Sequence, residues 1–308
     1  MKAYGISCVG LVRKGNEDNF IALPQYGVAA VADGMGGHRA GEVASQIAVQ
    51  VLEERAVELA HSSAQKAAEI LVMGIHNANM QIMREGMSQA MREGMGTTLS
   101  ALVVKEAQGI IGHVGDSRVY LWRNNILTQL TEDHSVVAEL VRSGQLTELQ
   151  AKDHPNRNML SRALGMGMEL DVDCFRIGLN VGDMFLLTTD GATNLLHEDE
   201  MAQVFAGAGE MFGEEDLGSS DEEAPEHPWQ AYLKCLSHMI LARGATDNYT
   251  MVCCSVEEED LSVDPAEGSA EGVPEGPGER SGEGPVGGES TIQFGSTHEF
   301  NRNEPGQR

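Results

Sequence analysis

Short apolar runs and longer amphipathic stretches follow one another along the N-terminal part of the chain. Residues 4–11, 19–23 and 28–32 are short, apolar and rich in small or β-branched residues, and we expect β-strands there. Residues 40–60 and 64–85 repeat Ala, Glu, Gln, Met and Leu with the 3.6-residue spacing of a helix. The pattern therefore predicts three strands followed by two long helices.

A second group of strands follows, and then the two types of element mix. The predicted strands of this group are TTLSALVV, GIIGHVG, SRVYLWR and ILTQLT. The stretch SVVAELVRSG predicts a helix that ends at Gly144, a common C-terminal residue. DVDCFRIGL, DMFLLTTD and NYTMVCCSVE predict further strands, and WQAYLKCLSHMILARG predicts a helix. Strands and helices come in groups, which favours an α+β fold with antiparallel sheets and helices packed outside them.

The composition changes sharply after residue 256. Residues 257–308 hold 13 acidic and 3 basic residues, with long stretches of Gly, Glu, Pro and Ser. Such a segment buries too little apolar surface to offset its chain entropy, so we expect a disordered acidic tail. The stretch 209–228 is similarly acidic and predicts a surface insertion. We therefore expect one catalytic domain over residues 1–256 and a tail over 257–308.

Charge and cysteine content limit the partners that we expect. The formal net charge of -26 argues against nucleic acid and membranes as partners, because both favour basic surfaces. The five cysteines are odd in number and form no C-x-x-C pair, which is typical of a reduced cytoplasmic protein. The N-terminal segment lacks the apolar stretch of a signal peptide, and no apolar run is long enough to span a membrane. We expect a cytoplasmic protein, and a monomer.

Aspartates lie at the ends of several predicted strands. They are Asp18, Asp33, Asp116, Asp190 and Asp247. Carboxylates at strand ends can converge on one point, where they repel one another unless cations hold them together. Hard divalent ions such as Mg²⁺ and Mn²⁺ prefer such oxygen ligands. The sequence also lacks the cysteine or histidine cluster of a zinc site, so these aspartates predict a magnesium or manganese centre.

The glycine-rich stretch VADGMGGHRAGEVA, residues 31–44, permits several interpretations. An Asp–Gly pair is most often a simple turn. A glycine beside a metal-binding aspartate also lets a backbone carbonyl approach the metal closely. A dinucleotide fingerprint fails because Arg39 stands where the third glycine is required, and the Gly-Lys-Ser/Thr of a P-loop is absent.

Eight segments, taken in order, resemble a known family. They are RKGNEDNF (13–20), VADGMGGH (31–38), GMGTTLSAL (94–102), GHVGDSRVY (112–120), LTEDHS (130–135), HPNRNMLSRALG (154–165), LLTTDGATNLL (186–196) and TDNYTMV (246–252). The chain is similar to the metal-dependent serine/threonine protein phosphatases of the protein phosphatase 2C, or PPM, family, and most of all to its compact bacterial branch. The resemblance covers residues 1 to about 256. It implies two antiparallel β-sheets packed as a sandwich, flanked by helices, with metals at one edge.

The resemblance also implies roles for the metal-binding residues. Asp33 would bridge two metal ions, and Asp190 and Asp247 would complete the first site. The backbone carbonyl of Gly34, with Glu17 or Asp18, would complete the second site directly or through water. Asp116 with Asp190 matches a third, weaker site. The cofactor would be Mn²⁺ or Mg²⁺, and oxygen ligands suit both ions.

Three more residues receive roles in catalysis. Arg13 matches the residue that binds the substrate phosphate, and its forked, permanent charge suits phosphate oxygens. His38 would donate a proton to the leaving oxygen or bond a metal-bound water, although a simple helix-capping role stays open. Asn248 would orient Asp247 or a water on the phosphate side. The segment 134–165 corresponds to a flap beside the cleft that affects substrate choice.

The implied activity is hydrolysis of phosphoserine and phosphothreonine in proteins by a metal-activated water, without a phosphoenzyme. The expected partners are phosphorylated proteins and a cognate serine/threonine kinase. Two alternatives stay open: a metal-binding scaffold without turnover, and a phosphatase for small phosphoesters. The sequence departs from the family pattern at Ala192 and Tyr249, neither of which is an implied ligand.

Overall fold

The computed structural model describes residues 1–36, 40–88, 94–207 and 228–261. His38, nearly all of the acidic stretch 209–228 and most of the tail 257–308 lie outside these ranges. Contacts divide the chain into one unit over Met1–Val263 and a second over Asp264–Arg308. Every described residue belongs to the first unit, and the fold below is the fold of that unit.

The first sheet has five strands, and every pairing in it is antiparallel. In spatial order they are β1 (Lys2–Cys8), β11 (Tyr249–Ser255), β10 (Met184–Thr188), β7 (Arg118–Arg123) and β8 (Ile126–Gln129). Strand β11 therefore lies between β1 and β10, and this places Asp247 and Asn248 beside the N-terminal loop.

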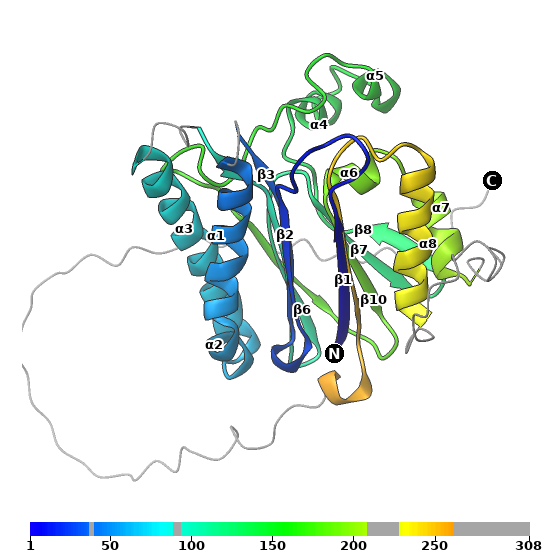
Figure 1. The fold of residues 1–308 in the computed structure, drawn as a ribbon. Helices are drawn as coiled ribbons and strands as arrows, with labels where there is room; N and C mark the ends of the chain where they lie inside the picture. The colour runs from blue at the N-terminus through cyan, green and yellow to red at the C-terminus, as the bar shows by residue number, and fades with distance from the viewer. Residues whose placement is uncertain (37–39, 89–93, 208–227, 262–308) are drawn as a thin grey trace, which may run out of the picture. The chain divides into compact units, whose positions relative to one another are not determined.

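The second sheet is also antiparallel throughout. Its spatial order is β2 (Asp18–Leu23), β3 (Val28–Met35), β5 (Leu99–Lys105), β6 (Gln108–Val114) and β9 (Asp173–Gly178), with β4 (Gly96–Thr97) paired to the end of β3. The two sheets lie face to face in the middle of the unit (Figure 1). This architecture confirms the predicted α+β sandwich of two antiparallel sheets.

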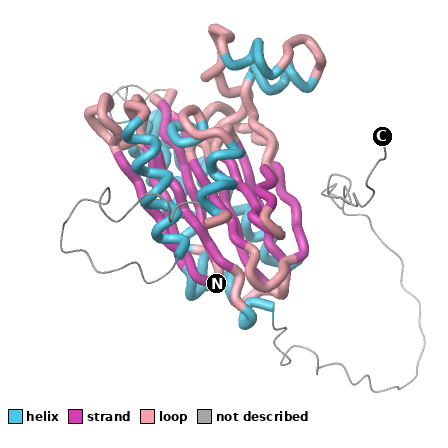
Figure 2. Tube along the Cα trace, turned by 90° about the vertical axis from the view of Figure 1, so that its right-hand side faces the viewer, coloured by secondary structure: helices cyan, strands magenta, loops and turns pink. Residues whose placement is uncertain are grey.

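Helices cover the outer faces of both sheets (Figure 1). Those on the second sheet are α1 (Ala40–Glu54), α2 (Ala56–Ala60) and α3 (Ala64–Ser88), and those on the first are α7 (Glu198–Phe205) and α8 (Pro228–Ala242). The short helices are η1 (Pro24–Tyr26), α4 (Val136–Arg142), α5 (Glu148–Lys152), α6 (Asp190–Thr193) and η4 (Glu258–Leu261). Figure 2 shows α4 and α5 standing clear of the sheets at one end. No helix in the described ranges is long and apolar enough to cross a membrane.

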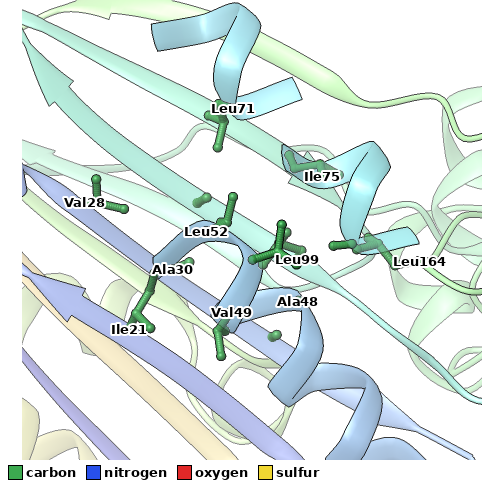
Figure 3. Packing of buried hydrophobic residues seen from close by; sticks show 14 of the residues in the cluster. Ile21, Val28, Ala30, Ala48, Val49, Leu52, Leu71, Ile75, Leu99 and Leu164 are labelled. Carbon is green, nitrogen blue, oxygen red and sulfur yellow. The ribbon is translucent and has the colours of Figure 1, made fainter. Parts of the chain in front are cut away.

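Strand β3 shows how the layers are held together. Val28, Ala30 and Ala32 pack against α1 and α3, whereas Ala29 and Val31 pack between the two sheets. Figure 3 shows the outer cluster, in which β3 and β2 face the apolar side of α1. Because both faces of β3 are buried, its sequence is a continuous apolar run rather than an alternation.

Two predicted element boundaries were wrong near the N-terminus, for local reasons. The strand expected over 4–11 ends at Cys8. Gly10 has φ +75°, and a Cβ there would collide with the carbonyl oxygen of Asp247, so the chain turns sharply at this glycine. The strand expected over 28–32 instead continues to Met35, because β4 pairs with its last residues.

The helix boundaries also differ from the prediction. The helix expected over 40–60 breaks at Arg55, whose N–H donates to the carbonyl of Leu52, three residues back, rather than four. The helix expected over 64–85 continues to Ser88. Helices α5, α6 and α7 were not predicted, because each spans only about two turns or fewer. The described structure also continues past residue 256 into η4, while the predicted tail boundary stays a prediction.

Candidate metal centre and active site

Five aspartates meet at one end of the sandwich, contributed by both sheets. Asp18 begins β2 and is the direct cross-strand partner of Asp33 in β3. Asp190 is the first residue of α6, just after β10, and Asp247 precedes β11. Asp116 lies in the turn between β6 and β7. The negative charges of these residues act on one another, so strand ends that are far apart in sequence are brought together as predicted.

Asp18 is deeply buried, with 5% of its surface exposed. Thr189 Oγ1 donates to its Oδ2 at 2.8 Å, while Oδ1 is buried without a hydrogen-bond partner among the described residues. Burial is the main reason that the pKa of Asp18 is raised to about 7, and the charges of Asp190 and Asp247 raise it further. Interactions with the side chains of Thr250 and Thr189 lower it in part. An unpartnered buried carboxylate oxygen requires a donor or a cation to stabilise it.

The side chains of Asp33 and Asp190 interact directly with each other. Two ionised carboxylates at such short range repel each other. Burial is the main reason that the pKa of both groups is raised. Asn194 Nδ2 also donates to Asp190 Oδ2 at 3.1 Å. A divalent cation between these two carboxylates would relieve their repulsion.

Asp116 is held at the centre by a tight turn. Gly115 before it has φ +111°, and a Cβ at that position would lie 2.6 Å from the side chain of Thr98. Burial is the main reason that the pKa of Asp116 rises to about 8, and the charge of Asp190 is the next. The side chains of Asp116 and Asp190 therefore sit in each other's field, as the implied third metal site requires.

Arg13 and Asp247 form an ion pair at the mouth of the site. Arg13 Nη2 donates to Asp247 Oδ2 at 2.7 Å, and the two side chains are 50% and 36% exposed. The hydrogen bond with Asp247 is the main reason that the pKa of Arg13 is raised. The structure thus places the predicted phosphate-binding arginine beside the predicted metal ligands, within reach of solvent.

The side chain of Asn248 contacts the N-terminal loop rather than Asp247 or solvent. Its Nδ2 donates to the carbonyls of Val9 and Gly15, both at 2.9 Å, and its Oδ1 accepts from the N–H of Glu17 at 2.9 Å. Its backbone N–H donates to Asp247 Oδ1 at 2.8 Å. Asn248 therefore holds the loop that carries Arg13 and Glu17, and it fixes Asp247 through its backbone.

Glu17 lies at the edge of the cluster, partly exposed. Burial raises the pKa of its carboxyl group, and the charge of Arg13 lowers it in part. Its backbone carbonyl accepts hydrogen bonds from the N–H of Gly34 and from Ser45 Oγ. These bonds tie the Glu17 loop to β3 and α1.

Packing explains the glycines that follow two of the aspartates. A Cβ on Gly34 would collide with the carbonyl oxygen of Gly41, and one on Gly191 would collide with that of Asn248. Each glycine therefore allows a neighbouring backbone to approach closely. The sequence interpretation, in which the glycine after Asp33 clears the way for a carbonyl ligand, does not account for this contact.

Two threonines support the centre: Thr98, for which the sequence predicts structural packing near the site, and Thr189, for which it predicts no role. Thr98 Oγ1 accepts from the N–H of Asp33, and the N–H of Thr98 donates to the Asp33 carbonyl, both at 2.9 Å. Thr189 Oγ1 donates to Asp18 and accepts from the N–H of Thr250 at 2.9 Å. Each belongs to a Thr-Thr pair at a strand end, and such a pair by itself indicates only packing in a strand.

The donor set fits hard divalent cations. In the described part of the chain, no group of three or more His, Cys, Asp and Glu side chains is arranged as a ready-made metal site. The carboxylates instead pair within the chain, Asp33 with Asp190 and Asp247 with Arg13. All the converging donors are oxygens, however, and the buried, unpartnered Oδ1 of Asp18 marks a position where a cation would relieve an unfavourable arrangement.

Comparisons with known proteins agree with this centre. The sequence model of the family described as Protein phosphatase 2C matches residues 15–222. The serine/threonine phosphatase stp of Listeria monocytogenes is 42% identical over 199 residues, 63% of this chain and 79% of that protein. Protein phosphatase PhpP of Streptococcus pneumoniae is 33% identical over 255 residues, 82% of this chain and 96% of that protein.

A solved structure shares the fold as well. The catalytic domain of the serine/threonine protein phosphatase PstP, crystallised in complex with two manganese ions, is 30% identical to this chain. The superposition has a TM-score of 0.69 and covers 83% of this chain and 98% of that one. Sequence, fold and the oxygen-lined centre lead to the same conclusion: the chain belongs to the protein phosphatase 2C family.

Proposed function

We propose that this protein hydrolyses phosphoserine and phosphothreonine in other proteins, with its reaction centre at the five converging aspartates. It is a metal-dependent protein serine/threonine phosphatase, as the family match and the named relatives support. The observation that carries the assignment of the centre is the convergence of Asp18, Asp33 and Asp190 around an unpartnered buried carboxylate oxygen of Asp18.

The ligand roles follow the position of each carboxylate. Asp33, central among the charges, would be a ligand shared by two ions. Asp190 and Asp247 would complete the first site, and the Gly34 carbonyl with Glu17 or Asp18 the second. Asp116, in the field of Asp190, would hold a third ion with it. Bound divalent ions would lower the pKa of a water and offset the negative charge of the phosphate.

Arg13 binds the phosphate at the mouth of the centre. Its ion pair with Asp247 uses Nη2, so the Nε and Nη1 hydrogens can reach phosphate oxygens. Asn248 and Gly10 fix the loop on either side of Arg13, which keeps the guanidinium at the mouth rather than free in solvent. The water's oxygen forms a bond to phosphorus as the bond to the seryl or threonyl oxygen breaks, and that oxygen leaves with a proton.

The remaining assignments are part of the same proposal. The ions are Mn²⁺ or Mg²⁺, and the manganese-containing relative supports the first. The protein acts as a cytoplasmic monomer that opposes a serine/threonine kinase. His38 donates the proton to the leaving oxygen or bonds a water. A scaffold without turnover is the second candidate, but the complete set of five aspartates does not favour it.

Turnover of a phosphothreonine peptide tests the proposal. We expect hydrolysis with Mn²⁺, none with chelator, and a loss of at least about a thousandfold in Asp190→Asn. Asp199→Asn is the matched control, because Asp199 is an exposed aspartate in the first turn of α7. Turnover that persists in chelator, or equal losses in the two variants, would contradict the assignment. No turnover in a wild-type protein that still binds Mn²⁺ would favour the scaffold.

A further inference from the structure

A shallow groove opens beside the metal centre, at the end of β3. It is about 430 Å³ in volume and is lined by Met35, Pro155, Asn156, Asn158, Met159, Leu160 and Met166. One wall is the last residue of β3. The other is the segment that leads from α5 toward β9, within the stretch that resembles the family's flap.

One lining residue of the groove, Met35, stands two positions beyond Asp33 in β3. Successive side chains of a strand point to opposite faces, so Met35 lies on the same face of β3 as Asp33. Ala29 and Val31 of that face pack between the sheets, and β3 pairs with β5 and then with β4 along its length. A spacing of two strand residues places Met35 roughly 7 Å along the strand from Asp33. An extended substrate chain spans this distance with about two residues.

Both walls are held by backbone pairing. Thr97 and Leu164 exchange two backbone hydrogen bonds of 3.0 and 2.9 Å, which fasten the far wall to β4. Ser135 and Leu160 form a second bridge. The N–H of Gly165 donates to the buried side chain of Asn79 at 2.7 Å. These contacts fix the shape of the groove against the end of the sheet.

The lining residues that the structure describes are uncharged, although the chain carries a net charge of -26. Met159 and Met166 are 53% and 59% exposed, which is a large exposure for two apolar side chains in one groove. Methionine is flexible and polarizable, so it adapts to apolar partners of different shapes. The acidic cluster on one side would repel an acidic substrate residue, whereas the groove offers an apolar residue a place to be buried.

We propose that this groove binds an apolar side chain of the phosphoprotein substrate, about two residues from the phosphorylated serine or threonine. The inference rests on the proposed function and adds a substrate preference to it. Met35, Met159 and Met166 determine that preference. Burial of one aliphatic side chain in an open groove corresponds to about a three- to tenfold gain in kcat/KM.

Matched phosphothreonine peptides test the proposal on the full chain with Mn²⁺. Each peptide carries Leu, Ala, Glu or Lys two residues before or two residues after the phosphothreonine, in an otherwise alanine background. The small substrate p-nitrophenyl phosphate reports the metal centre alone. The variants are Met159→Gln and Met166→Gln, and Met73→Gln is the control because Met73 is likewise 53% exposed but lies on α3.

We expect the Leu peptide to exceed the Ala, Glu and Lys peptides by about three- to tenfold at one of the two positions. Met159→Gln and Met166→Gln should remove most of that preference and leave turnover of the small substrate unchanged, while Met73→Gln should change neither. Equal values for all peptides, or equal losses on peptide and small substrate, would overturn the groove's role. A lack of turnover on every substrate would contradict the proposed function itself.

Discussion

The two ends of strand β3 are built in opposite ways. Residues Val28 to Ala32 have no exposed surface and pack apolar atoms against both neighbouring layers. Asp33 follows immediately and lies among the charges of Asp18, Asp190 and Asp116. Burial is the main reason that the pKa of each of these three carboxyl groups is raised. One end stabilises the fold, and the other gathers charges that destabilise it without a cation. Activity and stability should therefore respond in opposite ways to substitutions at the two ends.

The largest expected effect is on activity at the carboxylate end. Asp33→Asn removes the central charge and should lower kcat/KM for p-nitrophenyl phosphate at saturating Mn²⁺ by about a thousandfold or more. Circular dichroism should show an unchanged fold, because the amide group of the substituted side chain can still donate to Asp190. Retention of more than about a tenth of the activity would remove Asp33 from the reaction centre.

The next effect is on stability in the interior. Leu102 is buried between the sheets and has no exposed surface. The substitution Leu102→Ala should lower the unfolding free energy by about 2–5 kcal/mol. The activity of the folded protein should stay within about twofold, since Leu102 is remote from the carboxylates. Leu149→Ala, at a residue 75% exposed, is the control and should change the unfolding free energy little. A large activity loss in folded Leu102→Ala would show that the two ends are coupled.

A smaller effect concerns a buried histidine in the interior. Burial, and then the charge of His134, lowers the pKa of His113 to about 4, and the imidazole also faces Ser100 Oγ and the Glu132 carbonyl. The pKa of His113 in the folded protein lies below the unfolded value of 6.5. The stability that the neutral imidazole contributes is therefore fully present above pH 6.5 and is lost as the pH falls toward 4. The unfolding free energy lost in this way is at most roughly 3 kcal/mol.

Denaturant unfolding at about pH 7 and about pH 4.5 measures this contribution. The wild-type protein should lose more unfolding free energy between the two pH values than His113→Gln, in which position 113 does not titrate. Because both proteins contain the same carboxyl groups, comparing their losses of unfolding free energy removes the effect of those groups. Parallel losses in the two proteins would show that His113 is not held neutral in the fold.

The sequence predicted the layers of the fold and the gathering of the strand-end aspartates because both depend on local signals, while the ligand roles of these aspartates stay predictions. A short apolar run such as Val28 to Ala32, followed by an Asp–Gly pair, favours a buried strand, and the aspartate that ends the run is visible in the sequence. The family resemblance supplied the order of the segments and hence the sandwich. Short helices such as α6 and α7 were missed, because so few residues hold little periodic signal.

What the sequence did not predict depends on contacts between distant segments. The pairing of Asp18 with Asp33 follows from strand register, and the three bonds from Asn248 to the N-terminal loop require β11 to lie beside β1. Gly34 was interpreted through metal chemistry alone, and the structure adds that Gly34 and Gly191 each allow a close backbone contact. None of these contacts leaves a pattern in neighbouring residues.

Thermal unfolding with and without Mn²⁺ tests most directly the claim that the carboxylate end needs cations. At about pH 8 in chelator, the wild-type protein should be less stable than Asp33→Asn. Burial and the neighbouring carboxylates hold the pKa of Asp33 well above its ordinary value, so the wild type loses stability as the pH rises above that ordinary value, whereas asparagine does not titrate. Saturating Mn²⁺ should reverse this order, raising the Tm of the wild type by several degrees more than that of the variant. Equal Tm values in chelator, together with equal responses to Mn²⁺, would contradict the account.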